Sequence, residues 1–378
     1  MKKTVITLAM LGLLSATAPA LAQNADWLIV EVAPLSGPAS TVGTRLSKSA
    51  HMWADEVNAR GGIKGKKIRL VTCNDEGRPD KAVACTRDAV RDGAALVLAH
   101  SLTASLKAME PILAPNGPIM IIASPNIMPS PTSAAFQTSP SDNHITEAIA
   151  DFLHAGKLNS LGMIAATDAS GEVSLMSAKK IFDERKIKVD MARVDLKATD
   201  ATSQIAAVAG PNNMLVYSAY SGGGAAIVLK SFTNLGLKQP FLLSYANLSE
   251  AFIGVVKDFM PPRLLGTGVR SLVPSSMSDP VLRERAEKFA AAYKAKYNEQ
   301  ADMINILGKF DADVAEAVLT NVDNPADVKA AKAYLESNVI ESLHRIKFSP
   351  QSHVGLTSAD IIIAEYKNGR WQAADPIR

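Results

Sequence analysis

The sequence has few of the residues that build metal and redox centres. Its 378 residues include two cysteines and six histidines, and neither Cys-x-x-Cys nor His-Glu-x-x-His occurs. We therefore expect no metal site and no cofactor. The Gly-x-Ser-x-Gly motif of α/β-hydrolases is also missing, which removes the usual candidate for a nucleophilic serine. These absences predict a protein that is not an enzyme.

Neither sign of charge is in excess. Lys plus Arg number 40 and Asp plus Glu number 37, a net charge of +3. This balance predicts no nucleic-acid partner and no attraction to an anionic membrane surface. Apolar residues make up 47% and charged residues 20%. That composition is typical of a soluble globular protein, and the length favours two lobes over one.

The N-terminus has the pattern of an export signal. Met1-Lys2-Lys3 is basic, Thr4 to Leu14 is apolar, and Ala20-Leu21-Ala22 fits the small-x-small cleavage rule. The apolar run is shorter than the roughly 20 residues that span a bilayer as a helix. We expect residues 1–22 to be a signal peptide cleaved after Ala22, so that the protein is exported to the periplasm. An N-terminal core helix is the alternative.

Export changes the interpretation of Cys73 and Cys85, because an oxidising compartment permits a disulfide. Cys73 ends an apolar run, and Cys85 lies in the amphipathic segment that follows. A strand end and the next helix can bring two cysteines within bridging distance. A structural disulfide is therefore expected, with two buried free thiols as the alternative.

Strands and helices are predicted to alternate along most of the chain. The apolar run Trp27–Ala33 is typical of a buried parallel strand, and Leu46, Ala50, Trp53 and Val57 have helical spacing. Short connections between such units imply a parallel sheet. Further strands are expected at 68–73, 94–99, 119–123, 161–166, 186–191, 214–219, 240–244, 264–269 and 360–366. Further helices are expected at 79–92, 103–114, 145–155, 173–184, 203–209, 225–235, 280–297, 304–320 and 326–337.

Two segments interrupt this alternation and are predicted to cross between lobes. The first, 124–141, is rich in Pro and Ser, and the second is Leu272-Val273-Pro274. Near the C-terminus, Asn368-Gly369 is a hairpin signal.

Two other features receive a structural interpretation. Gly222-Gly223-Gly224 opens a helix after a strand but does not complete G-x-G-x-x-G, which favours a tight turn over a dinucleotide site. His51, His154 and His344 have no acidic residues at ligand spacing and are interpreted as surface or core histidines.

Small polar residues gather where the predicted strands end. Ser101, Thr103 and Ser105 follow the third strand, and Ser124 and Asn126 follow the fourth. Ligands of open α/β sheets bind at this edge, where helix N-termini also offer N–H groups to an anion. The pattern favours a carboxylate site, with simple helix capping as the alternative. The matching edge of the second lobe carries Ala169-Ser170-Gly171, Tyr217 to Ser221 and Tyr245-Ala246-Asn247. A cleft between two such edges is a natural ligand site.

Several segments resemble one family. Val32 to Pro38 (VAPLSGP), Asn58 to Ile68 (NARGGIKGKKI) and Asn74 to Val83 (NDEGRPDKAV) are similar to the Leu/Ile/Val-binding family, the type 1 periplasmic solute-binding proteins of ABC importers. The resemblance implies two Rossmann-like lobes joined by three crossovers, with the ligand in the interlobe cleft. The N-terminal lobe would comprise residues 23–141 and 273–357, and the C-terminal lobe residues 142–272 and 358–378.

The resemblance also implies which residues bind. The family's first lobe grips a carboxylate through the turns after its third and fourth strands. The positions that match here are Ser101, Thr103, Ala104, Ser105, Ala123, Ser124 and Asn126. In the second lobe the family's aromatic residue matches Tyr220, or Ser221 with a one-residue shift. The acid that holds an α-amino group falls at Tyr245, which is a departure from the family.

This departure determines the expected ligand. Neither Tyr245 nor nearby Asn247 can give an ammonium group a charge-assisted contact. We therefore expect a small organic or aromatic acid. The alternative is a branched-chain or other aliphatic amino acid, with Asp168 or Glu172 replacing the missing acid.

The family resemblance also implies the partner and the motion. A monomeric binding protein would deliver its ligand to an inner-membrane ABC permease, and a ligand-sensing receptor is the alternative class. Closure of the lobes would bend Ser139 to Asn143 and Ser271 to Pro274.

Overall fold

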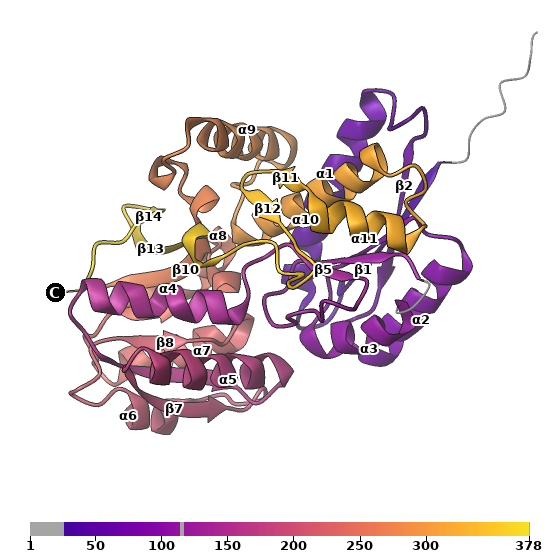
Figure 1. Cartoon of the computed structure of the whole chain (residues 1–378). Helices are drawn as coiled ribbons and strands as arrows, with labels where there is room; N and C mark the ends of the chain where they lie inside the picture. Colours follow the sequence, from indigo (N-terminus) through magenta and orange to yellow (C-terminus); the bar gives the residue numbers. More distant parts are fainter. Residues whose placement is uncertain (1–25, 114–116, 378) are drawn as a thin grey trace, which may run out of the picture.

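Two β-sheets, each covered by helices on both faces, form the two lobes of the molecule (Figure 1). The computed structural model describes residues 26–113 and 117–377. The predicted signal peptide and its cleavage site lie outside the described residues. The first sheet has the strand order β2-β1-β3-β4-β5, and the second has the order β14-β13-β10-β9-β8-β6-β7.

The first sheet is entirely parallel, as predicted. Helices α2 and α3 pack together on one face, and α1 and α10 pack together on the other. The strands are β1 (Trp27–Ala33), β2 (Ile68–Asn74), β3 (Leu96–Ala99), β4 (Ile119–Ile122) and β5 (Ala135–Gln137). The helices of this lobe are α1 (Ser40–Ala59), α2 (Pro79–Arg91), α3 (Thr103–Leu113), α9 (Pro280–Tyr297), α10 (Met303–Asn321) and α11 (Val328–Ser337).

The second sheet is parallel from β7 to β10, whereas β13 and β14 run antiparallel at its edge. Helices α4 and α5 cover one face, and α6, α7 and α8 cover the other. The strands are β6 (Ser160–Ala166), β7 (Lys188–Val194), β8 (Val216–Ser218), β9 (Phe241–Leu243), β10 (Leu264–Val269), β13 (Ile361–Lys367) and β14 (Arg370–Ala373). The helices are α4 (Asp142–Ala155), α5 (Ala169–Glu184), α6 (Thr202–Val208), α7 (Gly222–Asn234) and α8 (Glu250–Val256), with the 3-10 turns η1 (Tyr245–Asn247) and η2 (Lys257–Phe259).

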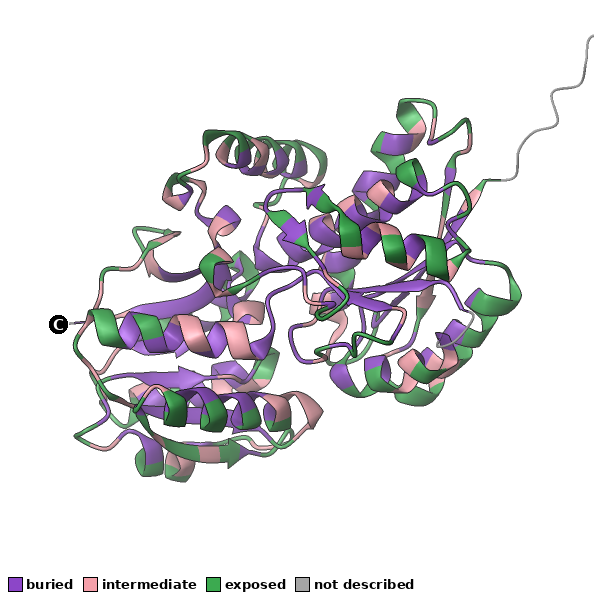
Figure 2. Ribbon diagram, in the orientation of Figure 1, coloured by how far each residue is buried: buried purple, intermediate pink, exposed green. Residues whose placement is uncertain are grey.

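Alternation within the strands explains why both faces of each sheet are covered. In β1, Ile29 packs toward α1 and α10, whereas Leu28 and Val30 pack toward α2 and α3. Successive side chains of a strand point to opposite faces, so a strand that is apolar throughout needs helices on both sides. Figure 2 shows the result, with buried strands at the centre of each lobe and exposed residues on the outer sides of the helices.

The chain passes between the two sheets three times. The first passage lies between β5 and α4. The second follows β10 and contains the 3-10 turns η3 (Arg270–Leu272) and η4 (Pro274–Ser276). The third leads through η5 (Ser358–Asp360) into β13.

His344 joins the second and third passages. Its Nε2 accepts the Ser271 N–H at 3.2 Å, and its Nδ1 lies 2.9 Å from Asp360 Oδ1. His344 is buried, which agrees with its interpretation as a surface or core histidine. Asp360 is 16 residues away in sequence, and only the fold brings the two side chains together.

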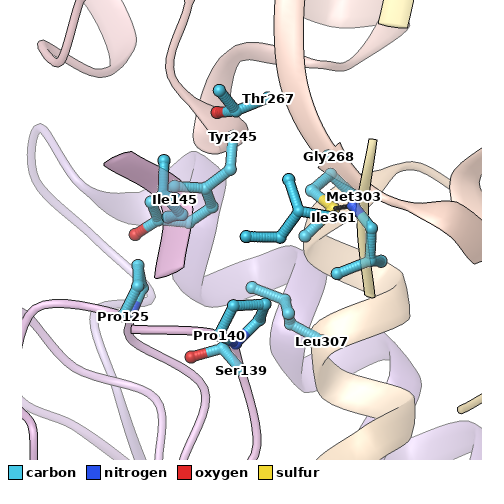
Figure 3. A pocket seen from close by; sticks show the side chains of 11 residues that line it. Pro125, Ser139, Pro140, Ile145, Tyr245, Thr267, Gly268, Met303, Leu307 and Ile361 are labelled. Carbon is cyan, nitrogen blue, oxygen red and sulfur yellow. Dashed lines mark hydrogen bonds between the residues drawn. The ribbon is translucent and has the colours of Figure 1, made fainter. Parts of the chain in front are cut away.

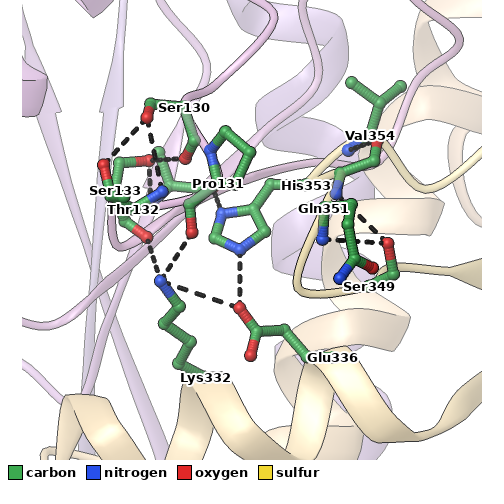
Figure 4. Close-up of polar contacts among 12 residues, drawn as sticks. Ser130, Pro131, Thr132, Ser133, Lys332, Glu336, Ser349, Gln351, His353 and Val354 are labelled. Atoms are coloured by element: carbon green, nitrogen blue, oxygen red, sulfur yellow. Dashed lines mark hydrogen bonds and ion pairs between the residues drawn. The ribbon is translucent and has the colours of Figure 1, made fainter.

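The Pro- and Ser-rich segment 124–141 is not simply a crossing. It contains β5, which pairs with β4 at the edge of the first sheet. His353 contacts β5 from outside the sheet, because its Nδ1 lies 3.0 Å from the Ala135 carbonyl. Its Nε2 lies 2.9 Å from Glu336 Oε1 of α11 (Figure 4). His353 also stacks on Phe136, with ring centroids 4.0 Å apart. The passage between the sheets is thus confined to the few residues after β5.

Other expectations had mixed outcomes. Cys73 and Cys85 form a disulfide with a Cα–Cα distance of 5.9 Å, which confirms the first of the two alternatives. Gly222 has a φ of 66°, consistent with the predicted tight turn, and the Asn368-Gly369 hairpin is present. The alternation did not predict α8, nor the hairpin of β11 (Val339–Glu341) and β12 (Arg345–Lys347). Both are short elements with little periodicity to detect.

Candidate functional site

The turn after β3 begins with a buried polar residue, His100. Its Nδ1 lies 2.7 Å from Glu31 Oε1, and its Nε2 lies 2.9 Å from Asp311 Oδ2. Burial alone would lower the pKa of His100. Hydrogen bonds to Asp311 and Glu31, together with their charges, outweigh burial and raise the pKa to about 9. A protonated His100 therefore anchors this turn to β1 and α10.

The residues predicted to bind in this turn have different surroundings. Ser101 Oγ donates a hydrogen bond to buried Asp75, so this hydroxyl serves the internal structure of the edge. Thr103 starts α3 and is buried, and Ala104 is exposed. Ser105 Oγ is buried without a hydrogen-bond partner in the part of the chain that the structure describes. A buried hydroxyl without a partner is uncommon and indicates a place for a water molecule or a ligand.

The turn after β4 brings Ala123, Ser124 and Asn126 to the same edge of the sheet. Asn126 N–H donates to Ser124 Oγ at 3.3 Å, and Asn126 Nδ2 donates to the carboxyl group of Asp142. Ala123 and Asn126 are buried, and Ser124 is half-buried. Of these three residues, Ser124 has the most accessible side chain.

Asp168 organises the turn after β6 in the second lobe. Its Oδ1 accepts hydrogen bonds from the Gly171 N–H and the Ser170 hydroxyl, both at 2.8 Å, which caps α5. The helix therefore starts at Ala169 instead of the expected Val173, and Ser170 lies in its first turn. The expected boundary was wrong because the cap, and not the apolar spacing, determines where the helix begins.

Asn247 joins the turns after β8 and β9. Its Oδ1 accepts the Gly222 N–H at 2.8 Å, and its Nδ2 donates to the Tyr220 carbonyl at 2.8 Å. The side chain is fully buried, so the Asn247 amide holds the site together instead of facing a ligand. Ser221 is exposed at the start of α7, and Tyr220 is buried beside it.

Tyr245 lies between the two lobes. It lines a small, partly open apolar gap, with Pro125 and Pro140 on the side of the first sheet (Figure 3). Met303 and Leu307 of α10 and Ile145 of α4 also line this gap. Burial raises the pKa of Tyr245 above its usual value, and the Asp142 charge adds to this, so the phenol stays protonated.

The residues predicted at the two sheet edges divide into those whose polar groups remain available and those whose polar groups bond within the protein. Helices α3 and α5, which begin at those edges, approach one another across the lobes (Figure 1). Internal hydrogen bonds do not fully use the side-chain groups of five of these residues: Ser105, Ser124, Tyr220, Ser221 and Tyr245. The hydroxyl of Ser101 and the amides of Asn126 and Asn247 are used within the protein.

Asp142, the first residue of α4, is absent from the predicted site although it contacts Asn126 and lies near Tyr245. The Ser-Asp sequence at the start of a helix is an ordinary capping signal. Nothing local in the sequence distinguishes it from other helix starts.

Comparisons with known proteins identify the family. The profile of the family described as periplasmic binding protein matches residues 29–370. The chain belongs to the periplasmic binding protein family. Within this family, it is 30% identical over 135 residues to Leu/Ile/Val-binding protein homolog 3 of Brucella melitensis, and 27% identical over 166 residues to Leu/Ile/Val-binding protein BraC3 of Rhizobium johnstonii. These matches cover 35% and 44% of this chain, and only 37% and 39% of the relatives' own lengths.

Solved structures of periplasmic binding proteins share the fold. An extracellular ligand-binding receptor from Rhodopseudomonas palustris superimposes with a TM-score of 0.82 at 16% identity, covering 93% of this chain and 99% of that one. An ABC transporter solute-binding protein from R. palustris, solved in complex with benzoate, gives a TM-score of 0.73 at 20% identity, covering 92% and 95%. The predicted type 1 fold is thereby confirmed.

Within residues 26–113 and 117–377, none of the helices is long and apolar enough to cross a membrane. The same residues contain no group of three or more His, Cys, Asp or Glu side chains arranged to hold a metal ion.

Proposed function

We propose that this protein is the substrate-binding component of an ABC importer and that it captures a small carboxylate-bearing solute between its lobes. The chain would be exported to the periplasm with residues 1–22 as a cleavable signal, and it would act as a monomer that meets an inner-membrane permease. It would bind its ligand without transforming it. Family membership supports this general role.

The turns after β3 and β4 would hold the ligand carboxylate. Ser105 and Ser124 offer hydroxyl groups there, and α3 begins at Thr103, where the first N–H groups of a helix have no partner within the helix. Hydroxyl and N–H donors at a helix start are the groups that bind an anion.

The preferred ligand is an aryl carboxylate, and Tyr245 carries this preference. The phenol of Tyr245 stays protonated, and it lies after β9 of the second sheet, beside the apolar gap between the lobes. The apolar lining of this gap suits contact with an aromatic ring, whereas an ammonium group would meet no carboxylate at position 245. The benzoate found in the R. palustris protein shows that this fold accommodates such a ligand.

An aliphatic amino acid is the second candidate, and the names of the curated relatives favour it. Asp168 could supply the negative charge, because its charge acts on both Tyr220 and Tyr245. Glu172 is less suited: its side chain is about half exposed and pairs with Arg193 at 2.7 Å.

Calorimetric titration with benzoate and with leucine tests the proposal. We expect benzoate to bind the unmodified protein and leucine to be inert. The Asp168→Asn variant should bind benzoate at least as well, since a negative charge near the ligand is removed. Tight binding of leucine that Asp168→Asn abolishes would replace the first candidate by the second. Failure of both ligands would contradict the ligand proposal and leave the family assignment intact.

A further inference from the structure

The carboxyl group of Asp142 bonds to both lobes. Its Oδ2 accepts a hydrogen bond from Asn126, in the turn after β4, and another from Ser174 Oγ of α5 at 2.9 Å. Its backbone N–H donates to the Pro125 carbonyl at 3.2 Å. Asp142 is also the first residue after the passage from β5 to α4 and is buried. One side chain at the first passage between the lobes thus contacts the turn after β4 in the first lobe and a helix of the second lobe.

The same carboxyl group faces two phenols of the second lobe. Tyr217 of β8 and Tyr245 of η1 both experience the charge of Asp142. Burial, the larger cause, raises the pKa of each phenol above its usual value. Both phenols therefore stay neutral across the physiological pH range, and the ionisation of Asp142 is the variable charge at this point.

We propose that Asp142 is a positioning residue of the ligand site, which sets Asn126 and Tyr245 relative to one another. Asp142 takes up a proton when the lobes come together around a small carboxylate ligand. The inference rests on the proposed function, because it concerns the same site. It adds that binding is coupled to proton uptake.

The direction of this coupling follows from the surroundings of Asp142. Burial raises its pKa from 3.8 to about 7, although Ser174 and Asn126 donate hydrogen bonds that act in the opposite direction. When the lobes separate, water reaches the carboxyl group and its pKa returns toward the usual range. The protein with its lobes together therefore binds the proton more tightly than the protein with its lobes apart. Low pH thus favours the arrangement in which the lobes are together.

A carboxylate ligand reinforces this direction. A negative charge nearby raises the pKa of Asp142 further, whereas a ligand with an ammonium group would lower it. Affinity for a carboxylate should therefore fall as pH rises from about 5 to about 7 and level off above that. One proton limits the change to about tenfold per pH unit.

Other ionisable groups near Asp142 could produce a different pH dependence. Asp168 faces Tyr245 from the cap of α5. On α4 itself, burial lowers the pKa of His144, while Glu147 and, from the third passage, Asp360 raise it. His144 Nδ1 accepts the Ser141 N–H, so its protonation would disturb the cap of α4. A variant of His144 is therefore the matched control.

The main test is the dissociation constant of benzoate at several pH values between about 5.5 and 8.5, where benzoate remains ionised. The unmodified protein should lose affinity by about tenfold or more over this range. Asp142→Asn keeps the size of the side chain and both hydrogen-bond acceptor contacts but cannot titrate, and its affinity should be flat within about twofold. His144→Gln should retain the slope of the unmodified protein. An equal slope in Asp142→Asn, or affinity that rises with pH, would overturn the proposal.

Two measurements decide the question if a variant fails to fold or benzoate fails to bind. Titration of the unmodified protein in two buffers of different ionisation enthalpy counts the protons taken up with benzoate. We expect a fraction of one proton at about pH 5.5, because part of the ligand-free protein already has its lobes together there, and close to none at about pH 8.5. Small-angle scattering of the ligand-free protein should show a larger radius of gyration at the higher pH, where Asp142 is ionised. No proton uptake with bound benzoate, or an unchanged radius of gyration, contradicts the role of Asp142. Absence of benzoate binding alone contradicts only the ligand proposal.

Discussion

Asp311 of α10 holds His100 of the β3–α3 turn, with 2.9 Å between Asp311 Oδ2 and His100 Nε2 in the fully buried interior of the first lobe. Glu31 of β1 binds the other ring nitrogen. Thr138 Oγ1 donates to the second oxygen of Asp311 at 2.5 Å. One buried network therefore connects a strand, the turn of the candidate site and the first residue of the first passage between the lobes.

This network predicts a loss of stability at alkaline pH. The folded-state pKa of His100, about 9, is above its usual value of 6.5. The stabilisation is therefore complete below about pH 6.5 and is lost as pH rises through about 9, by an amount on the order of 3 kcal/mol. Urea unfolding from pH 6 to 10 measures it. The His100→Gln variant should lack this decline, and parallel pH profiles of the two proteins would show that His100 is not charged in the folded state.

The disulfide between Cys73 and Cys85 should stabilise the first lobe without taking part in binding. It ties β2 to α2 across a separation of 12 residues. Replacing both cysteines by serine should lower the free energy of unfolding by about 3 kcal/mol, because the unfolded chain gains freedom. Chemical denaturation checks the loss. The benzoate dissociation constant should stay within about twofold, and a larger change would place the disulfide in the binding mechanism.

Gly224 should be required for the position of Tyr220. A Cβ atom at Gly224 would lie 2.2 Å from Cζ of the Tyr220 ring, so Gly224→Ala must displace the ring. We expect benzoate affinity to fall by about tenfold, equivalent to about 1.4 kcal/mol. Gly223→Ala is the matched control, since a Cβ atom there meets no described atom within 4 Å. Equal affinities of the two variants would remove Tyr220 from the site.

The hydroxyl of Tyr245 should contribute to ligand affinity more than to stability. Tyr245→Phe keeps the ring but removes the phenol, and a lost hydrogen bond to a charged ligand costs about 1.5 to 3 kcal/mol. Benzoate affinity should therefore fall by roughly tenfold or more. Tyr334→Phe on α11, outside the candidate site, should leave affinity unchanged. Unchanged affinity in Tyr245→Phe would mean that the phenol does not contact the ligand.

The sequence was sufficient to predict the layers and the edges of the fold. Apolar runs such as Trp27–Ala33 and the helical spacing around Trp53 are local signals, and parallel strands bring their carboxyl ends to one edge whatever the register. The strand β5 was missed because Ala135–Gln137 is short and lies among Pro and Ser residues. Its place depends on partners far along the chain, since Gln137 N–H donates to the His353 carbonyl at 2.8 Å.

The polar networks of the site could not be predicted for the same reason. His100 pairs with Glu31 and Asp311 at separations of 69 and 211 residues, and no local pattern records such a pairing. In the sequence, Asp142 has the pattern of an ordinary helix start, whereas in the structure its carboxyl group contacts both lobes. Residue type predicted which turns would carry hydroxyl groups. Only the structure distinguishes Ser101, which bonds to Asp75, from Ser105, whose hydroxyl has no partner among the described residues.

A crystal structure of the protein with benzoate would test where the ligand binds. We expect the benzoate carboxylate at the turns after β3 and β4, within hydrogen-bonding distance of Ser105 or Ser124, with its ring beside Tyr245 and with both lobes in contact with the ligand. Benzoate outside the space between the lobes would contradict the proposed binding site. So would an amino acid retained from the cell in that space, with its ammonium group against Asp168.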